Sequence, residues 1–212
     1  MAEATTPGTR TRTADRILDV ALVAFGTRGY DATSLDAVAG ELGVTKQTVL
    51  YWFPSKVALL EAVIERSADE LRDALDHALA GAGPGLPRLD AVMHTVFRFA
   101  VRRPELLGLV REAGRCGPDV AADVGARLAP LVDRAVSMLE SEMTAGTIRR
   151  ADARLTLLFL YATVVGVATE AEAVRAVGLE PGPATLARMR RELFGFVRSA
   201  LGAPPGRGPR SG

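Results

Sequence analysis

Apolar residues recur along most of the chain with the spacing of amphipathic helices, and no segment alternates apolar and polar residues as a strand does. The fold is therefore predicted to be all-α. The first helix is expected to begin near Thr13 and to stop at Gly29. Its apolar face would consist of Ile17, Val20, Ala21, Ala24 and Phe25.

A second helix is expected to start at Thr33, whose hydroxyl can cap it while Asp36 complements the positive helix end. Gly43 permits a left-handed turn after this helix, and Thr45 can cap a third one. The third helix should be short, because Pro54 disfavours helical geometry in the residue before it.

Later apolar periods predict helices at 56–80, 86–103, 104–113, 118–145, 152–177 and 183–201. Pro130 is expected to kink or split the longest of them. The Pro-, Gly- and Arg-rich end, 202–212, is expected to be a disordered tail, and 1–12 a flexible arm. Arg10 and Arg12 of that arm would either enter a minor groove or stay solvated.

Charge alone gives no sign of nucleic-acid binding, because the net charge is only +1. The only two lysines, Lys46 and Lys56, nevertheless lie in the stretch from Leu42 to Lys56, which has no acid. No run of apolar residues is long enough to span a membrane, and no secretion signal opens the chain. Because the lone Cys116 cannot close an intrachain disulfide, a cytoplasmic protein is expected.

The segment from Thr33 to Phe53 has the pattern of helix, tight turn and helix that places a second helix in a major groove of DNA. On that helix three residues can face the core: Val49, Trp52 and Phe53. Five others would project outward: Lys46, Gln47, Thr48, Leu50 and Tyr51. Gln pairs with adenine, Lys with guanine or phosphate, and Thr with phosphate or a thymine methyl. A corner between two helices in any bundle would give the same spacing.

Beyond this pattern, residues 16–60 resemble the N-terminal domain of the TetR (tetracycline-repressor) family. RILDVALVAFGTRGYDATSLDAVAGELGV, residues 16–44, is similar to the family's first two helices. TKQTVLYWFPSKVALL, residues 45–60, is similar to its recognition helix and to the start of its fourth helix. The resemblance implies a helix-turn-helix domain at 13–56 and a helical ligand-binding and dimerisation domain at 57–201.

The resemblance also implies roles for individual residues. It implies that Thr33 and Ser34 contact phosphates and that Tyr51 and Lys56 contact the DNA backbone. The residues implied to face the groove are Thr45, Lys46, Gln47 and Thr48. The alternative for Thr33 and Thr45 is capping alone. Leu50 departs from the family, which usually has a tyrosine there. Either Leu50 touches a thymine methyl, or Tyr51 takes over the backbone contact.

In the second domain the resemblance is architectural, apart from GTIRRAD at 146–152, which is similar to the turn before the family's eighth helix. It implies a homodimer through the helices at 152–177 and 183–201, a near-palindromic DNA operator and an unidentified small-molecule ligand. The expected ligand contacts are Met93, His94, Phe97, Arg98, Leu107, Val110, Arg111, Met138 and Phe159, with Cys116 as a further polar member. Core packing is the alternative for each apolar one.

Enzyme chemistry finds little support in this sequence. Its only two histidines, His77 and His94, have no metal-spaced partners, and no nucleophile elbow occurs. Neither a metal nor a cofactor is expected. The preferred interpretation is a ligand-released transcriptional repressor, and the alternative is a helical ligand-binding or adaptor protein that does not bind DNA.

Overall fold

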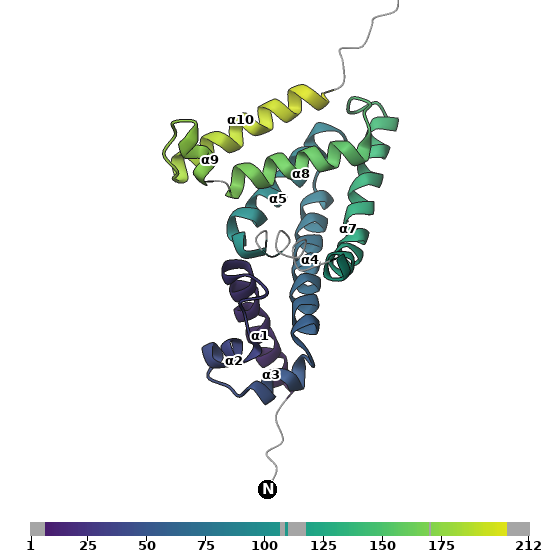
Figure 1. Cartoon of the computed structure of the whole chain (residues 1–212). Helices are drawn as coiled ribbons and strands as arrows, with labels where there is room; N and C mark the ends of the chain where they lie inside the picture. The colour runs from purple at the N-terminus through teal and green to yellow at the C-terminus, as the bar shows by residue number, and fades with distance from the viewer. Residues whose placement is uncertain (1–6, 107–108, 110–117, 170, 203–212) are drawn as a thin grey trace, which may run out of the picture. The chain divides into compact units, whose positions relative to one another are not determined.

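A computed structural model describes residues 7–106, 109, 118–169 and 171–202, which are helical throughout apart from turns, loops and one isolated bridge between Ile148 and Gly202 (Figure 1). The chain divides into two compact units. Unit 1 comprises residues 1–70 and 103–129, and unit 2 comprises residues 71–102 and 130–212. The long helices α4 (Lys56–Ala80) and α7 (Pro118–Thr144) each contribute to both units. These units are defined by packing and not by function, so the expected boundary at 56/57 between a DNA-binding and a ligand-binding domain stays a prediction.

Unit 1 contains α1 (Pro7–Arg28), α2 (Leu35–Leu42), α3 (Lys46–Trp52) and the first turns of α4 and α7. These elements bury one apolar core, whose fully enclosed members include Ile17, Phe25, Val38, Val49, Leu59, Leu60, Ile64 and Leu109. The expected start near Thr13 and the flexible arm through residue 12 are corrected, because α1 begins at Pro7. Proline suits the first position of a helix, and no helix breaker stands between Gly8 and Thr13.

Close packing of α1 in unit 1 depends on a glycine. A Cβ placed on Gly26 would overlap the backbone carbonyl of Glu105. Charged pairs add to this packing: Arg66 of α4 reaches Asp19 of α1 at 2.8 Å, and Arg127 of α7 reaches Glu61 of α4 at 2.9 Å.

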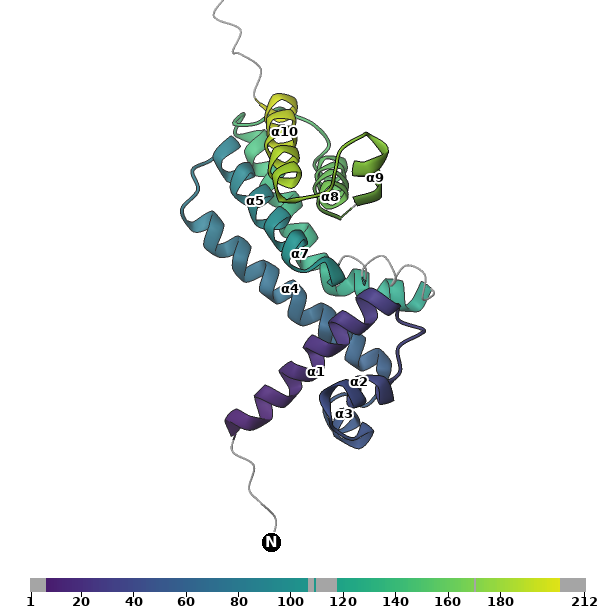
Figure 2. The same cartoon turned by 90° about the vertical axis from the view of Figure 1, so that its left-hand side faces the viewer.

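Unit 2 contains the remainders of α4 and α7, together with α5 (Leu86–Arg102), α8 (Ala153–Thr169), α9 (Ala171–Ala176) and α10 (Pro183–Leu201). Figures 1 and 2 show α8 and α10 side by side. The core between α5, α7, α8 and α10 includes Leu89, Met93, Phe97, Leu139, Val164, Leu193, Phe194 and Val197.

Several expectations for these helices can be compared with the structure. The range 152–177, expected to be one helix, contains α8 up to Thr169 and α9 from Ala171, and the residue between them lies outside the described residues. Pro130 lies inside α7 and does not split it. The predicted turn before α8 is confirmed: Gly146 has a φ of 70°, and Asp152 caps α8 by accepting the N–H of Leu155 at 2.9 Å. Most of 104–113 and the tail at 203–212 lie outside the described residues.

A buried carboxylate ties two turns of unit 2 together. Glu142 accepts hydrogen bonds from the Gly85 N–H at 2.7 Å and from the Thr147 hydroxyl at 2.5 Å, and it pairs with Arg88 at 2.7 Å. Burial by itself would raise the pKa of Glu142, but these hydrogen bonds and the charge of Arg88 together hold the pKa below its ordinary value.

Replacing Gly26 by alanine should lower the free energy of unfolding by about 1–3 kcal/mol, because a rigid backbone carbonyl stands where the new methyl group must go. Urea unfolding followed by circular dichroism measures this change. Gly125→Ala in α7 is the matched control, since nothing lies within 4 Å of its new methyl group. The control should instead raise the free energy of unfolding by about 0.5–1 kcal/mol. Equal effects of the two changes would contradict the close approach of Gly26 to the Glu105 carbonyl.

Glu142→Gln should cost about 1–3 kcal/mol of unfolding free energy at pH 7, because Arg88 loses its charged partner. Since folding lowers the pKa of Glu142, its charge stabilises the fold above the unfolded pKa of about 4.5, and this contribution is lost as the pH falls further. Urea titrations between pH 3 and 7 should therefore show the difference from wild type shrinking toward acid. Exposed Glu140→Gln on the same helix should change stability by no more than about 0.5 kcal/mol at any pH.

Candidate DNA-binding interface

A left-handed glycine sets the turn between α2 and α3. Gly43 has a φ of 67°, and its N–H caps the end of α2 by donating to the carbonyls of Ala39 and Gly40. The Val44 N–H donates to the Ala39 carbonyl at 3.0 Å, and the half-buried Val44 packs against the unit 1 core. Thr45 then caps α3 by accepting the Thr48 N–H at 3.2 Å. The expected turn and the expected cap at Thr45 are both confirmed.

One buried side chain anchors α3 to unit 1. Val49 is fully buried in the core, and Leu50, Trp52 and Phe53 are half-buried against it. The helix ends at Trp52, and its C-cap Phe53 is extended with a φ of −132° before Pro54. Lys46, Gln47 and Tyr51 are exposed, and Thr48 is half-buried. The expected inward and outward faces are therefore confirmed, except that Leu50 leans into the core.

The start of α2 differs by one residue from the expectation. Ser34 is the N-cap, since its hydroxyl accepts the Ala37 N–H at 3.1 Å. Thr33 is only 1% exposed, and its hydroxyl donates to the Gly29 carbonyl at 2.8 Å and lies 3.2 Å from that of Ala24. The expected helix start at Thr33 is therefore wrong. The Thr33 hydroxyl is used within the fold, and its expected phosphate contact stays a prediction.

Both lysines of this surface have partners within the protein that the sequence pattern did not reveal. Lys46 Nζ lies 2.7 Å from a carboxylate oxygen of Asp36 in α2. Lys56 Nζ donates to the Asp31 carbonyl at 3.3 Å and lies 4.2 Å from the centre of the Tyr30 ring. Such pairs join residues of different elements, so helical spacing alone could not predict them.

The expected ligand contacts that the structure describes lie on α5, α7 and α8, and their role stays a prediction. Met93 and Phe97 are buried in the α5 part of the core, and Met138 packs partly buried beside them. His94 and Arg98 are exposed, with the His94 ring edge-on to Phe194 at 4.4 Å. Phe159 of α8 is 63% exposed, and its expected ligand contact stays a prediction. Leu107, Val110, Arg111 and Cys116 lie outside the described residues.

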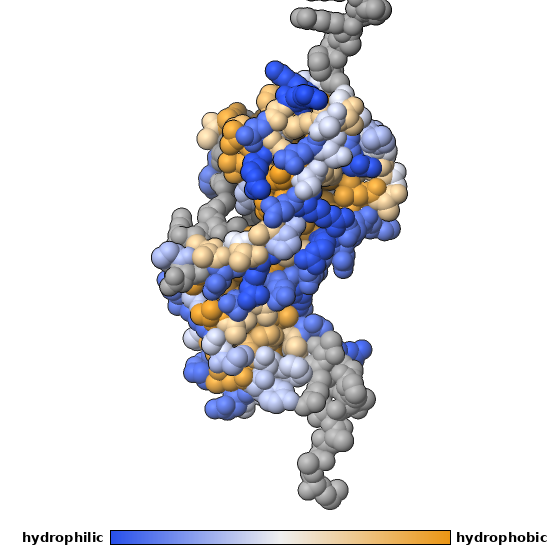
Figure 3. Space-filling model, turned by 90° about the vertical axis from the view of Figure 1, so that its right-hand side faces the viewer, coloured by the Kyte–Doolittle hydropathy of each residue, from blue (hydrophilic) through white to orange (hydrophobic). Residues whose placement is uncertain are grey.

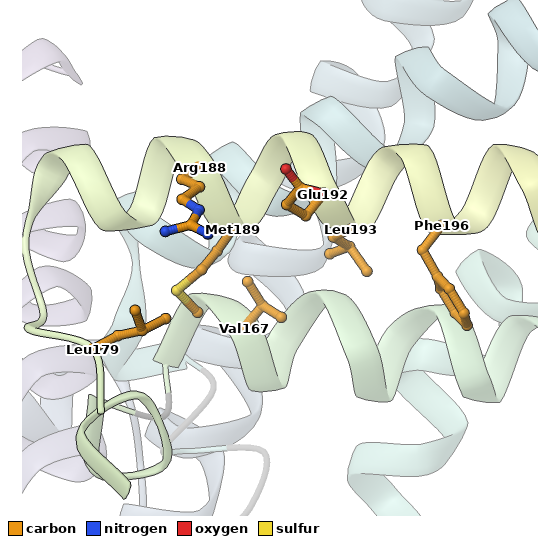
Figure 4. Close-up of a pocket in the computed structure, with 7 residues that line it drawn as sticks. All are labelled: Val167, Leu179, Arg188, Met189, Glu192, Leu193 and Phe196. Carbon is orange, nitrogen blue, oxygen red and sulfur yellow. The ribbon is translucent and has the colours of Figure 1, made fainter. Parts of the chain in front are cut away.

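An open groove of about 400 Å³ lies elsewhere in unit 2, between the end of α8 and α10. Figure 4 shows Met189 and Leu193 of α10 turned toward Val167 of α8. Arg188 and Glu192 are the charged residues that line the groove. Large apolar side chains of both helices also reach solvent: Leu155, Leu158 and Phe159 of α8 and Phe196 of α10 are between 50 and 68% exposed. By contrast, the face drawn in Figure 3 carries many hydrophilic residues between separate apolar patches.

The region that carries this helix-turn-helix geometry has a recognisable counterpart. Residues 17–63 match the model of the bacterial regulatory proteins of the tetR family. Over these residues the chain is similar to the tetR family.

Two curated regulators are similar to part of the chain. The chain is 33% identical over 91 residues to the HTH-type transcriptional repressor KstR of Mycolicibacterium smegmatis, covering 43% of this chain and 45% of that protein. It is 32% identical over 110 residues to the HTH-type transcriptional activator FasR of the same species, covering 51% and 50%. The match therefore spans about half the length of these curated relatives.

Solved structures of regulators share the fold over most of the chain. The fatty acid degradation regulator FadR from Bacillus halodurans superposes with a TM-score of 0.72 at 16% identity, covering 92% of this chain and 96% of that one. AibR, solved in complex with isovaleryl coenzyme A and operator DNA, gives 0.70 at 20% identity, covering 86% and 96%. These likenesses confirm the predicted all-α architecture.

Among the described residues, no group of three His, Cys, Asp or Glu side chains is placed to hold a metal ion. No helix in the described part of the chain is long and apolar enough to cross a membrane.

Proposed function

We propose that this protein is a transcriptional regulator, a repressor that binds operator DNA through two copies of its helix-turn-helix domain and is released by a small molecule. The observation that carries the proposal is the geometry of α3. Its buried face fixes it to unit 1 through Val49, while Lys46, Gln47 and Tyr51 stay exposed for a major groove. The named roles of KstR as a repressor and of AibR in an operator complex support it. Such a regulator acts in the cytoplasm and is not an enzyme.

Within this proposal the polar residues take distinct roles. Ser34, exposed at the start of α2, is placed to meet a phosphate, and Lys56 and Tyr51 serve as backbone contacts. Four residues face the bases: Lys46, Gln47, and Thr45 and Thr48, whose hydroxyls hydrogen-bond to each other. Since Leu50 packs partly into the core, we assign the backbone contact of the missing family tyrosine to Tyr51.

Self-association is part of the proposed function, because two recognition helices must reach major-groove faces about 34–36 Å apart. The exposed apolar residues of α8 and α10 form a surface that a second copy would cover. Burying such side chains supplies about 25 cal/mol per Å² of apolar surface. We therefore place the homodimer interface on α8 and α10.

Release by a ligand requires that the ligand prefer the state that does not bind DNA. A coupling of about 1–3 kcal/mol between ligand and DNA would relieve repression by roughly 5- to 150-fold. AibR, with its bound isovaleryl coenzyme A, shows that this fold accommodates a small molecule.

The DNA-binding proposal is tested by fluorescence anisotropy of the purified protein on its upstream intergenic DNA, with random DNA as competitor and with salt varied. Gln47→Ala should cost about 1–3 kcal/mol on the selected duplex and relax the preference at one base pair. Lys56→Ala should weaken binding to all sequences and reduce the salt slope by about one unit. Wild-type binding that is no better than to random DNA across several neighbouring regions would favour a helical adaptor protein instead.

The dimer surface is tested by Phe159→Lys, which introduces a charge into the apolar face of α8. Light scattering after size exclusion should give twice the 22.4 kDa of one chain for the wild type and a single chain for the variant. Val101→Lys, at an exposed valine of α5, is the matched control and should remain dimeric. A dimer that survives Phe159→Lys unchanged would place the interface elsewhere.

A further inference from the structure

The cation at the start of the recognition helix is already engaged in the free protein. Lys46 Nζ lies 2.7 Å from Asp36 Oδ2, so an ion pair joins the first turn of α3 to the first turn of α2. Both side chains reach solvent, with 48% of Lys46 and 63% of Asp36 exposed. A DNA phosphate or base that Lys46 contacts therefore competes with this carboxylate.

Asp36 has a second electrostatic role at the same place. It stands in the first turn of α2, two residues after the N-cap Ser34. A carboxylate there complements the positive end of the helix, as a bound phosphate would. The negative charge of Asp36 thus interacts with both Lys46 and the positive start of α2. These are the same two groups that would bind a DNA phosphate.

We infer that Asp36 is an intramolecular competitor of DNA, an inference that rests on the proposed DNA-binding function. When Lys46 moves to DNA, its pair with Asp36 is broken, and the freed carboxylate then faces a polyanion. Both costs fall on DNA of any sequence, so Asp36 lowers affinity in general. Removing this acid from the recognition surface should tighten binding, although it removes a salt bridge from the protein.

The same helix offers a matched acid. Glu41 of α2 is 39% exposed and pairs at 2.5 Å with Arg28 of α1. It carries the same charge as Asp36 but holds no cation of the recognition helix. Glu41→Gln therefore measures what the loss of any exposed acid from this domain does to DNA affinity.

Asp36→Asn and Glu41→Gln are compared with the wild type by anisotropy on the selected and random duplexes, between roughly 50 and 200 mM salt. Asp36→Asn should tighten binding to both duplexes by about two- to fivefold, the range of an exposed ion pair. It should also steepen the dependence of log K on log salt by up to about one unit. Glu41→Gln should give a smaller change.

Lys46 supplies the decisive comparison. In a Lys46→Met background, the effect of Asp36→Asn should fall to that of Glu41→Gln, because no cation is left for Asp36 to hold. Weaker binding of Asp36→Asn would overturn the inference, since Asp36 would then be positioning Lys46 for DNA. Equal effects of Asp36→Asn and Glu41→Gln, or equal effects of Asp36→Asn with and without Lys46, would also overturn it.

The wild-type titration separates this inference from the function on which it rests. A wild type that does not prefer its upstream DNA over random DNA counts against the proposed regulator. A wild type that does prefer it, with Asp36→Asn behaving like Glu41→Gln, counts against the competitor alone. Thermal unfolding of each variant confirms that the compared proteins are folded.

Discussion

The exposed face of α3, which carries Lys46, Gln47 and Tyr51, depends on the packing of Val49 in the core of unit 1. The helix α3 has only seven residues, well below the roughly 12–15 that an isolated helix needs to be even marginally stable in water. Its position is therefore set by packing against the unit 1 core and by the caps at its two ends. Because Val49 is fully enclosed, the opposite face of α3 must point outward, and its polar residues are presented on a fixed support.

Under the proposed function, DNA binding at this surface is an exchange of partners. Lys46 is paired with Asp36, and Lys56 lies against the Asp31 carbonyl and the Tyr30 ring. A chain with a net charge of +1 has little long-range attraction for DNA, so the proposed affinity would come from local contacts that replace these internal ones. This arrangement explains why bulk charge gave no sign of the proposed function.

Much of the helical framework could be predicted from apolar spacing and from capping residues. The bounds of α4, α5 and α10 agree with the expected ranges to within one residue, because Gly and Pro mark their ends. The choice of Ser34 over Thr33 as a cap could not be predicted, since both can cap and the difference comes from the contacts of Thr33 with Gly29 and Ala24. The exposure of Phe159 could not be predicted for a related reason. Nearly every side of α8 is apolar, so its sequence does not tell which side faces the core of its own unit.

The central claim is that two copies of the chain each place α3 in a major groove of one operator. Hydroxyl-radical footprinting of the upstream intergenic DNA tests it most directly. The account predicts two protected segments, related by a near-palindrome and centred one helical turn, about 10 base pairs, or a multiple of it apart. A single unpaired footprint, or protection that does not depend on sequence, would contradict it.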